Sequence, residues 1–272
     1  MQRTKGSLRR QQGLTIVELI VVMVVLGILI PLFSFILATY RDTYTLDDQV
    51  KMSSATKQAL WYMEDRVRVA NAFMATVPSP FTDAYGLHNA GTAGAEAWSY
   101  KGDSSSSRVL ITKSYASTTN PLNTGRQPVF KNTAEFNCTT QIYYQPQLTF
   151  LTVYFVREGT LYRRVLTDTT SALCPGNTQQ QRQSCPPEIT SGRHSSCQAN
   201  DEALLSNVAS FSIAYYQITL AGTSTQIDPD YTSTDPAVIS DADYVIVTIL
   251  TSTRNGTVTN EISQRITKVN QE

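Results

Sequence analysis

The residues of this chain best placed to do chemistry lie in one short junction between Gly13 and Glu18. A glycine ends a basic leader there, and a long apolar segment begins directly after it. Glu18 is the single carboxylate in this segment, and a charge at the centre of a bilayer helix costs about 2.5–3.5 kcal/mol. Because an ionisable residue in such a place is by default functional, Glu18 predicts a partner of opposite charge.

The flanking segments must position this junction in a membrane. Residues 19–40 hold no charged residue over 22 positions, and as a helix they would measure about 33 Å, enough to cross a bilayer core of about 30 Å. A secretory signal peptide would have a shorter apolar region and a small-x-small cleavage site. The basic leader places the N-terminus inside the cell, and its cations are Arg3, Lys5, Arg9 and Arg10. A plain membrane anchor would explain length and orientation, but neither Gly13 nor Glu18.

This junction resembles that of type IV prepilins, in which a positive leader, a glycine, a hydrophobic residue and a glutamate at the fifth mature position occur in register. The resemblance implies that a membrane prepilin peptidase cleaves between Gly13 and Leu14 and N-methylates Leu14. It also implies that Glu18 neutralises the terminal amine of a neighbouring copy. The partners implied are other major and minor pilins, the inner-membrane assembly platform and membrane lipid.

The chain beyond the apolar segment predicts the outer half of the same helix. We divide the chain into a leader at 1–13, a transmembrane and filament-core helix at 14–40 and an amphipathic helical half at 41–77. Pro78 and Pro80 are expected to end the helix. Its apolar stripe follows spacings of three and four or their multiples and consists of Leu46, Val50, Leu60, Met63, Val67, Ala70 and Met74.

Residues 78–272 predict an extracytoplasmic domain built mainly of antiparallel β-sheet, so the fold class is α+β with a pilin fold. An irregular excursion at 81–107 precedes strands expected at 108–113, 141–144, 148–156, 161–167, 208–220, 244–252 and 258–269. The turn from Arg157 to Thr160 contains a glycine and predicts a hairpin. The strand at 244–252 is apolar on both faces, which predicts an interior position, and the polar strand at 258–269 is expected at an edge.

Two short stretches resemble the larger minor subunits of these systems. Residues 153–164 end in Leu-Tyr-Arg-Arg, and residues 204–216 form a strand introduced by a leucine-rich turn. Both are similar to J-type minor pseudopilins of type II secretion and to W-type minor pilins of type IV pili. This resemblance favours a minor subunit over a major one.

Four cysteines lie on the outer side of the membrane in this topology, where disulfides persist. They are Cys138, Cys174, Cys185 and Cys197. Their spacings include no Cys-x-x-Cys motif, and only His194 lies near them in sequence. If the hairpin turns at Arg157 and Thr160, Cys174 comes near Cys138. That register favours Cys138–Cys174 with a local Cys185–Cys197 loop, while a zinc site stays open as the alternative.

No catalytic constellation is present in the sequence, and we expect no enzyme activity and no cofactor. The mature part, with 18 basic and 22 acidic residues after removal of the four leader cations, has a net charge of about −4 and no basic stripe for nucleic acid. An acidic group has the oxygen ligands that calcium prefers, but it also suits a polar loop of turn-forming residues. It consists of Asp228, Asp230, Asp235, Asp241 and Asp243.

These patterns predict a single-pass inner-membrane protein whose C-terminal domain is periplasmic or extracellular once in a filament. The predicted function is a minor pilin or pseudopilin that initiates, or sits near the tip of, a type IV pilus or a type II secretion pseudopilus; DNA uptake is a third such machine. A membrane-anchored adhesin or binding domain that forms no filament is the alternative. Cleavage at Gly13 distinguishes the two, because a plain anchor keeps its leader.

Overall fold

The computed structural model describes residues 15–86, 98–119, 125, 127–132, 138, 146–175, 178–235, 237–253, 256 and 258–269. The chain divides into two compact units, residues 1–48 and residues 49–272. One long helix, α1 (Ile16–Val67), contributes its first part to one unit and its last part to the other. The strand expected at 141–144 lies outside the described residues.

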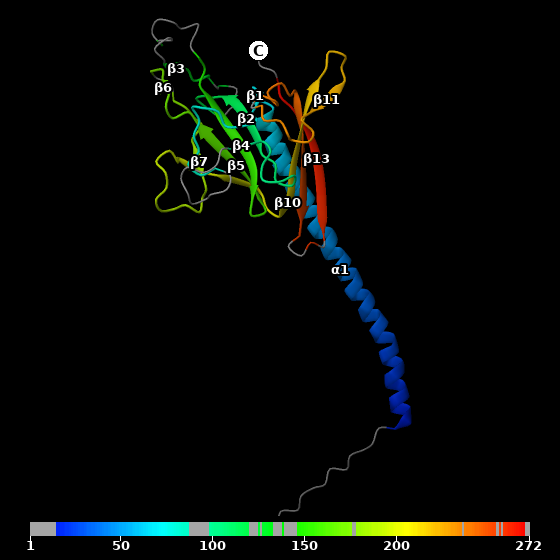
Figure 1. Ribbon diagram of the computed structural model, residues 1–272. Helices are drawn as coiled ribbons and strands as arrows, with labels where there is room; N and C mark the ends of the chain where they lie inside the picture. Colours follow the sequence, from blue (N-terminus) through cyan, green and yellow to red (C-terminus); the bar gives the residue numbers. More distant parts are fainter. Residues whose placement is uncertain are drawn as a thin grey trace, which may run out of the picture. The chain divides into compact units, whose positions relative to one another are not determined.

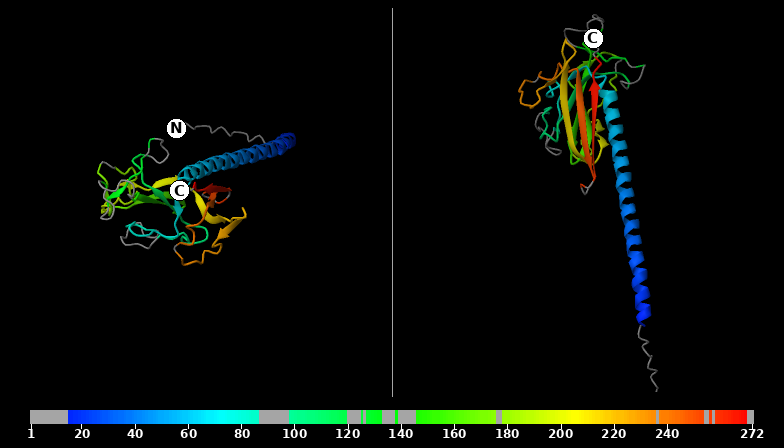
Figure 2. Two further views of the ribbon diagram at one scale, coloured as in Figure 1. Left: turned by 90° about the horizontal axis from the view of Figure 1, so that it is seen from above. Right: turned by 90° about the vertical axis from the view of Figure 1, so that its right-hand side faces the viewer.

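The larger unit contains two main sheets (Figure 1). The five-stranded sheet is antiparallel throughout and has the order β1 (Ala72–Phe73), β2 (Leu110–Tyr115), β4 (Thr149–Arg157), β5 (Thr160–Thr167), β9 (Glu202–Leu205). The four-stranded sheet, also antiparallel, has the order β11 (Ser224–Ile227), β10 (Val208–Ile218), β12 (Tyr244–Ser252), β13 (Thr259–Thr267). Figure 2 shows both sheets from two further directions.

The end of α1 and the two sheets share one apolar core. The helix contributes Ala59, Leu60, Met63 and Val67, which lie in the same buried cluster as residues of the five-stranded sheet and of the four-stranded sheet. From the sheets the cluster takes, among others, Leu110, Tyr154, Leu161, Ile213, Val245 and Ile249. The predicted fold, a long N-terminal helix packed on antiparallel sheet, is therefore confirmed.

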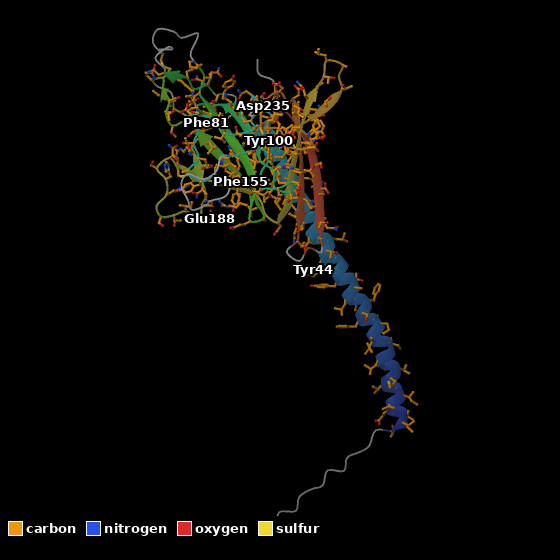
Figure 3. The ribbon with its side chains drawn as sticks, viewed as in Figure 1. Tyr44, Phe81, Tyr100, Phe155, Glu188 and Asp235 are labelled. Carbon is orange, nitrogen blue, oxygen red and sulfur yellow. A yellow bond between two sulfur atoms is a disulfide. The ribbon has the colours of Figure 1, made fainter. Side chains whose placement is uncertain are left out.

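A second buried cluster lies on the other face of the five-stranded sheet. It includes Leu151, Val153 and Phe155, which alternate along β4 with residues that face the helix. The segment before β2 covers this face with Phe81 and Trp98. Phe81 and Phe155 are both labelled in Figure 3.

The prediction of the helix end was wrong by several residues. α1 ends at Val67 rather than at residue 77, and β1 follows almost at once. The amides of Asn71 and Met74 donate to the carbonyls of Lys113 and Ile111, so the chain is already paired with β2 there. Met74 packs in the second cluster, across the sheet from the helix stripe. Sheet pairing overrides a local apolar spacing that continues through Met74.

The beginning of the predicted apolar stripe also differs from the structure. Leu60, Met63 and Val67 are fully buried, whereas Leu46 and Val50 are 60% and 66% exposed. Within the larger unit the buried face of the helix begins at Thr56. An amphipathic spacing shows which residues share a face, but it does not show how far along the helix the covering sheet reaches.

The predicted hairpin is confirmed, and so are the predicted strands that fall within the described residues, to within two residues at each end. Arg157 pairs with Thr160, and the register continues to Phe150 opposite Thr167. Glu158 and Gly159 both have positive φ, 50° and 71°, as a two-residue turn that matches the strand twist requires. β12 lies between β10 and β13, and β13 is an edge strand.

Candidate functional site

The first turn of α1 holds the one candidate assembly residue that the structure describes. Glu18 and Thr15 close on each other: the Thr15 amide and hydroxyl donate to Glu18 Oε2 at 3.0 and 3.1 Å, and the Glu18 amide donates to Thr15 Oγ1 at 3.3 Å. This is a capping box, in which two side chains satisfy each other's free helix amides. Gly13 and Leu14 lie outside the described residues.

The capping box is a role of Glu18 that our sequence analysis missed, although the Thr15-x-x-Glu18 spacing signals it. Cleavage after Gly13 would leave this box intact, because Leu14 still supplies the carbonyl of the Thr15 peptide bond. A capping residue contributes about 0.5–2 kcal/mol to a helix. Glu18 therefore has a local structural role beside the intermolecular one that the prepilin resemblance implies.

The helix after this turn presents an uncovered apolar surface. Within the described residues α1 is the one helix long and apolar enough to cross a membrane, and its most apolar stretch is not buried inside the protein. Every large apolar side chain from Ile16 to Leu37 is exposed. The helix continues through Pro31, which removes the amide that Gly27 O would accept. Such a surface requires lipid or other helices around it.

The cysteines form two disulfides, in the pairing that the hairpin register favoured. Cys138 is bonded to Cys174, and Cys185 to Cys197, with Cα atoms 5.6 Å apart in each pair. Cys174 follows β6 (Ala172–Leu173), which pairs with β3 (Lys131–Asn132). Cys185 ends β7 (Ser184–Cys185), which runs parallel to β8 (Ala199–Asn200). The described residues contain no cluster of three or more His, Cys, Asp or Glu side chains placed to hold a metal.

We expect both bridges in the exported protein. Non-reducing peptide mapping should find Cys138–Cys174 and Cys185–Cys197 and no free thiol. Serine at both positions of the second pair should lower the free energy of unfolding by about 3 kcal/mol, because the closed loop no longer restricts the unfolded chain. Stoichiometric bound zinc with free thiols in the mature protein would contradict this prediction.

The acidic group expected to be either a calcium site or a polar loop organises its own backbone. Asp228 accepts hydrogen bonds from the Tyr100 hydroxyl and, at 3.0 Å, from the Thr232 amide. Asp235 caps the Ala237 amide at 2.8 Å. Asp243 Oδ2 accepts from the Ile218 amide at 2.6 Å. The contacts with Thr232 and Ala237 are those of turn-forming residues, whereas the contacts with Tyr100 and Ile218 connect the acidic group to other parts of the larger unit.

A buried ion cluster in the larger unit was not predicted from the sequence. Arg164 on β5 is 1% exposed and binds Asp201 Oδ2 at 2.6 Å and Asp83 Oδ2 at 2.8 Å. Its Nη1 also donates to the carbonyl of Tyr85 at 2.6 Å. Burial acts to lower the pKa of Arg164, but the hydrogen bonds and charges of Asp201 and Asp83 outweigh it and raise that pKa. The cluster ties the segment around residue 83 to the second face of the sheet.

Comparison with known proteins gives a sequence match near the N-terminus and distant structural matches. The model of the prokaryotic N-terminal methylation motif matches residues 8–30. A search of curated proteins finds no match. A type IV-like pilin from Thermus thermophilus is similar over 79% of this chain and 96% of its own chain, with 9% identity and a TM-score of 0.35. That score is too low to support a conclusion.

The matched motif coincides with the junction and with the start of the apolar helix. The match begins in the basic leader, spans the junction at Gly13 and Glu18, and ends within the uncovered apolar part of α1. The chain therefore carries a prokaryotic N-terminal methylation motif at the start of its apolar helix.

Proposed function

We propose that this protein is a minor pilin or pseudopilin that prepilin peptidase cleaves between Gly13 and Leu14 and methylates at Leu14. The mature subunit leaves the inner membrane with the help of the assembly platform. It joins other pilins at or near the tip of a type IV pilus or a type II secretion pseudopilus. Its larger unit is periplasmic or extracellular.

One observation carries this proposal: the methylation motif leads directly into a helix whose apolar surface is uncovered. In the membrane, lipid covers that surface. In a filament, the same surface packs against the helices of neighbouring subunits, and burial of apolar area stabilises the assembly by about 25 cal/mol per Å². The same helix can thus be stable in both environments without refolding.

The assignment to a minor subunit is supported by the size of the larger unit and by the hairpin that ends in Leu-Tyr-Arg-Arg. β5 contains this sequence at Leu161–Arg164. The side chains of Arg163 and Arg164 lie on opposite faces of the sheet. Arg163 binds Glu202 on the helix side at 2.9 Å, and Arg164 enters the buried cluster on the other side. The hairpin that resembles the larger minor subunits therefore makes ion pairs on both faces of the five-stranded sheet.

Cleavage is the direct test of the first step. In cells with an active prepilin peptidase, mass spectrometry of the membrane fraction should find a mature protein that begins with N-methylated Leu14. Gly13→Val should block cleavage, because the cleavage site of the motif requires the glycine. Gly6→Val, a matched change within the leader, should leave cleavage unaltered. An intact leader on the wild-type chain would favour the plain membrane anchor.

A further inference from the structure

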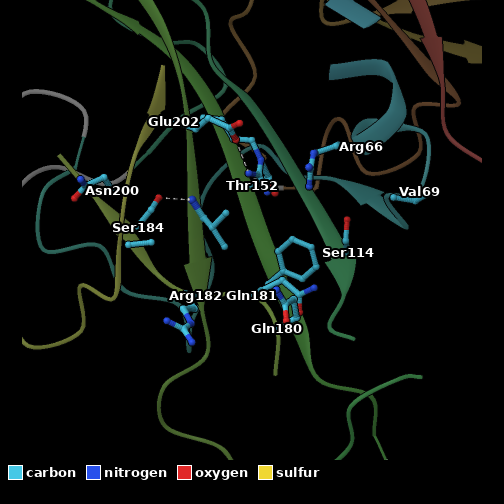
Figure 4. A pocket seen from close by; sticks show the side chains of 14 residues that line it. Arg66, Val69, Ser114, Thr152, Gln180, Gln181, Arg182, Ser184, Asn200 and Glu202 are labelled. Atoms are coloured by element: carbon cyan, nitrogen blue, oxygen red, sulfur yellow. Dashed lines mark hydrogen bonds and ion pairs between the residues drawn. The ribbon is translucent and has the colours of Figure 1, made fainter. Parts of the chain in front are cut away.

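The larger unit contains a cavity of about 480 Å³ on the five-stranded sheet, shown in Figure 4. Its floor includes Ser114, Thr152 and Val165, which come from β2, β4 and β5. Arg66 and Val69 at the end of α1 border it, as does the segment that contains Gln180–Arg182. The cavity exists because α1 ends at Val67 while the sheet beneath continues. Ligand pockets commonly measure about 300–1,000 Å³.

The charge in this cavity is positive. Three arginines line it, Arg66, Arg163 and Arg182, against one carboxylate, Glu202. Glu202 is already engaged, because Oε2 accepts from Arg163 at 2.9 Å and from the Tyr62 hydroxyl at 2.7 Å. In the described part of the chain, neither Arg66 nor Arg182 has a carboxylate partner. Two guanidinium groups are thus left to bind an anion.

Buried donors in the cavity lack partners. The Nε atoms of Arg66 and Arg163 are both buried without a hydrogen bond among the described residues, although the side chain of Arg163 is 13% exposed. A buried donor without a partner costs about 1–3 kcal/mol, and such groups are rare in native proteins. Both atoms belong to residues that line the cavity, but each is closed to solvent, so an acceptor in the cavity can be bound only by the other guanidinium nitrogens of these side chains.

The remaining lining is suited to hydroxyl groups. Among the described residues the side chains of Ser114, Thr152, Gln180 and Asn200 have no hydrogen-bond partner, and together they offer both donors and acceptors. Phe150 and Val165 add a small apolar surface. β4, the middle strand of the floor, is paired on both sides, with β2 and β5, so its backbone cannot bind a peptide by strand addition. Recognition here must use side chains.

We propose that this cavity binds an acidic monosaccharide unit. The carboxylate of the sugar forms ion pairs with Arg66 and Arg182. The hydroxyl groups of the sugar form hydrogen bonds with the free amide and hydroxyl side chains, and the C–H face of the sugar packs on Phe150. The ligand is a hexuronate or a uronate residue of a longer glycan. This inference does not depend on the filament proposal, because the whole cavity lies in one subunit.

The test uses the full-length protein in a zwitterionic detergent, because sugar-based detergents would compete. D-galacturonate is titrated beside D-galactose, which has a hydroxymethyl group in place of the carboxylate, and beside acetate, which lacks the sugar. Saturation-transfer NMR and chemical-shift titration should show galacturonate binding at least tenfold more tightly than either control. Equal binding of galactose, equal binding of acetate or no binding of galacturonate would each overturn the proposal.

Variants locate the site. Arg182→Gln, an exposed position whose replacement leaves the core intact, should weaken galacturonate binding about tenfold, as expected for loss of one charge-assisted contact. Thr152→Val should weaken it less and leave the thermal unfolding midpoint nearly unchanged. Arg68→Gln, the matched control at the end of α1, does not line the cavity and should bind like the wild type. Unchanged binding by both Arg182→Gln and Thr152→Val would place the sugar elsewhere and refute the assignment.

Discussion

Replacement of Glu18 with glutamine is expected to abolish incorporation of the subunit into filaments while membrane insertion and leader cleavage continue. Glutamine keeps the hydrogen bonds of the capping box but removes the negative charge. If that charge pairs with the Leu14 amine of a neighbouring subunit, its loss leaves a buried cation unpaired, at a cost of about 3–5 kcal/mol. The measurement is co-purification of the variant with partner pilins and its presence in the sheared filament fraction.

Thr15→Ala is the matched control for this prediction. It removes the hydroxyl that caps the Glu18 amide but keeps the carboxylate, so it should cost only about 0.5–2 kcal/mol of helix stability. Filaments should still contain this variant. The opposite pattern, normal incorporation of Glu18→Gln with failure of Thr15→Ala, would make Glu18 a capping residue alone.

Position in the filament affects the outcome. A subunit at the extreme tip has no neighbour beyond it, so it depends less on Glu18 than a shaft subunit does. If Glu18→Gln is incorporated normally and still co-purifies with partner pilins, the tip position is supported. If neither the variant nor the wild type co-purifies with pilins, the filament proposal fails.

The agreement between sequence and structure is best where local chemistry determines geometry. The turn at Glu158 and Gly159 fixes the register of β4 and β5 as far as Phe150 and Thr167. Beyond that point the pairing of β6 with β3, which the sequence did not predict, precedes the predicted Cys138–Cys174 bond. The apolar composition of β12 predicted its place between β10 and β13, although its residues alternate between buried and half-buried positions rather than being buried on both faces. In each case a few neighbouring residues carry the information.

The prediction was less accurate where residues distant in sequence determine the local structure. Whether the chain at Asn71 stays helical depends on β2, which lies far away in sequence and accepts its hydrogen bonds. The Leu-Tyr-Arg-Arg sequence indicated the hairpin but not the buried cluster. Strand alternation required one of the two arginines to face inward, yet its partners Asp83 and Asp201 come from segments with no pattern that links them to β5. The cavity could not be predicted from the sequence either, because it depends on where α1 ends.

The buried cluster should make Arg164 the most sensitive charged residue of the larger unit. Arg164→Met keeps much of the volume but leaves two carboxylates, 4% and 0% exposed, without their cation. We expect the free energy of unfolding to fall by about 3–5 kcal/mol. Chemical denaturation of the full-length protein in detergent, followed by tryptophan fluorescence, measures it, because Trp98 donates to Asp83 at 2.6 Å within the same cluster.

Two comparisons separate the charge effect from a packing effect. Arg157→Met, in the neighbouring strand, breaks an ion pair whose carboxylate, Glu188, is 55% exposed, and it should cost about 1 kcal/mol or less. Adding Asp83→Asn and Asp201→Asn to Arg164→Met should restore part of the lost stability, because the uncompensated charges are then gone. If the triple variant is less stable than Arg164→Met alone, hydrogen bonding and packing, rather than buried charge, hold this face of the sheet together.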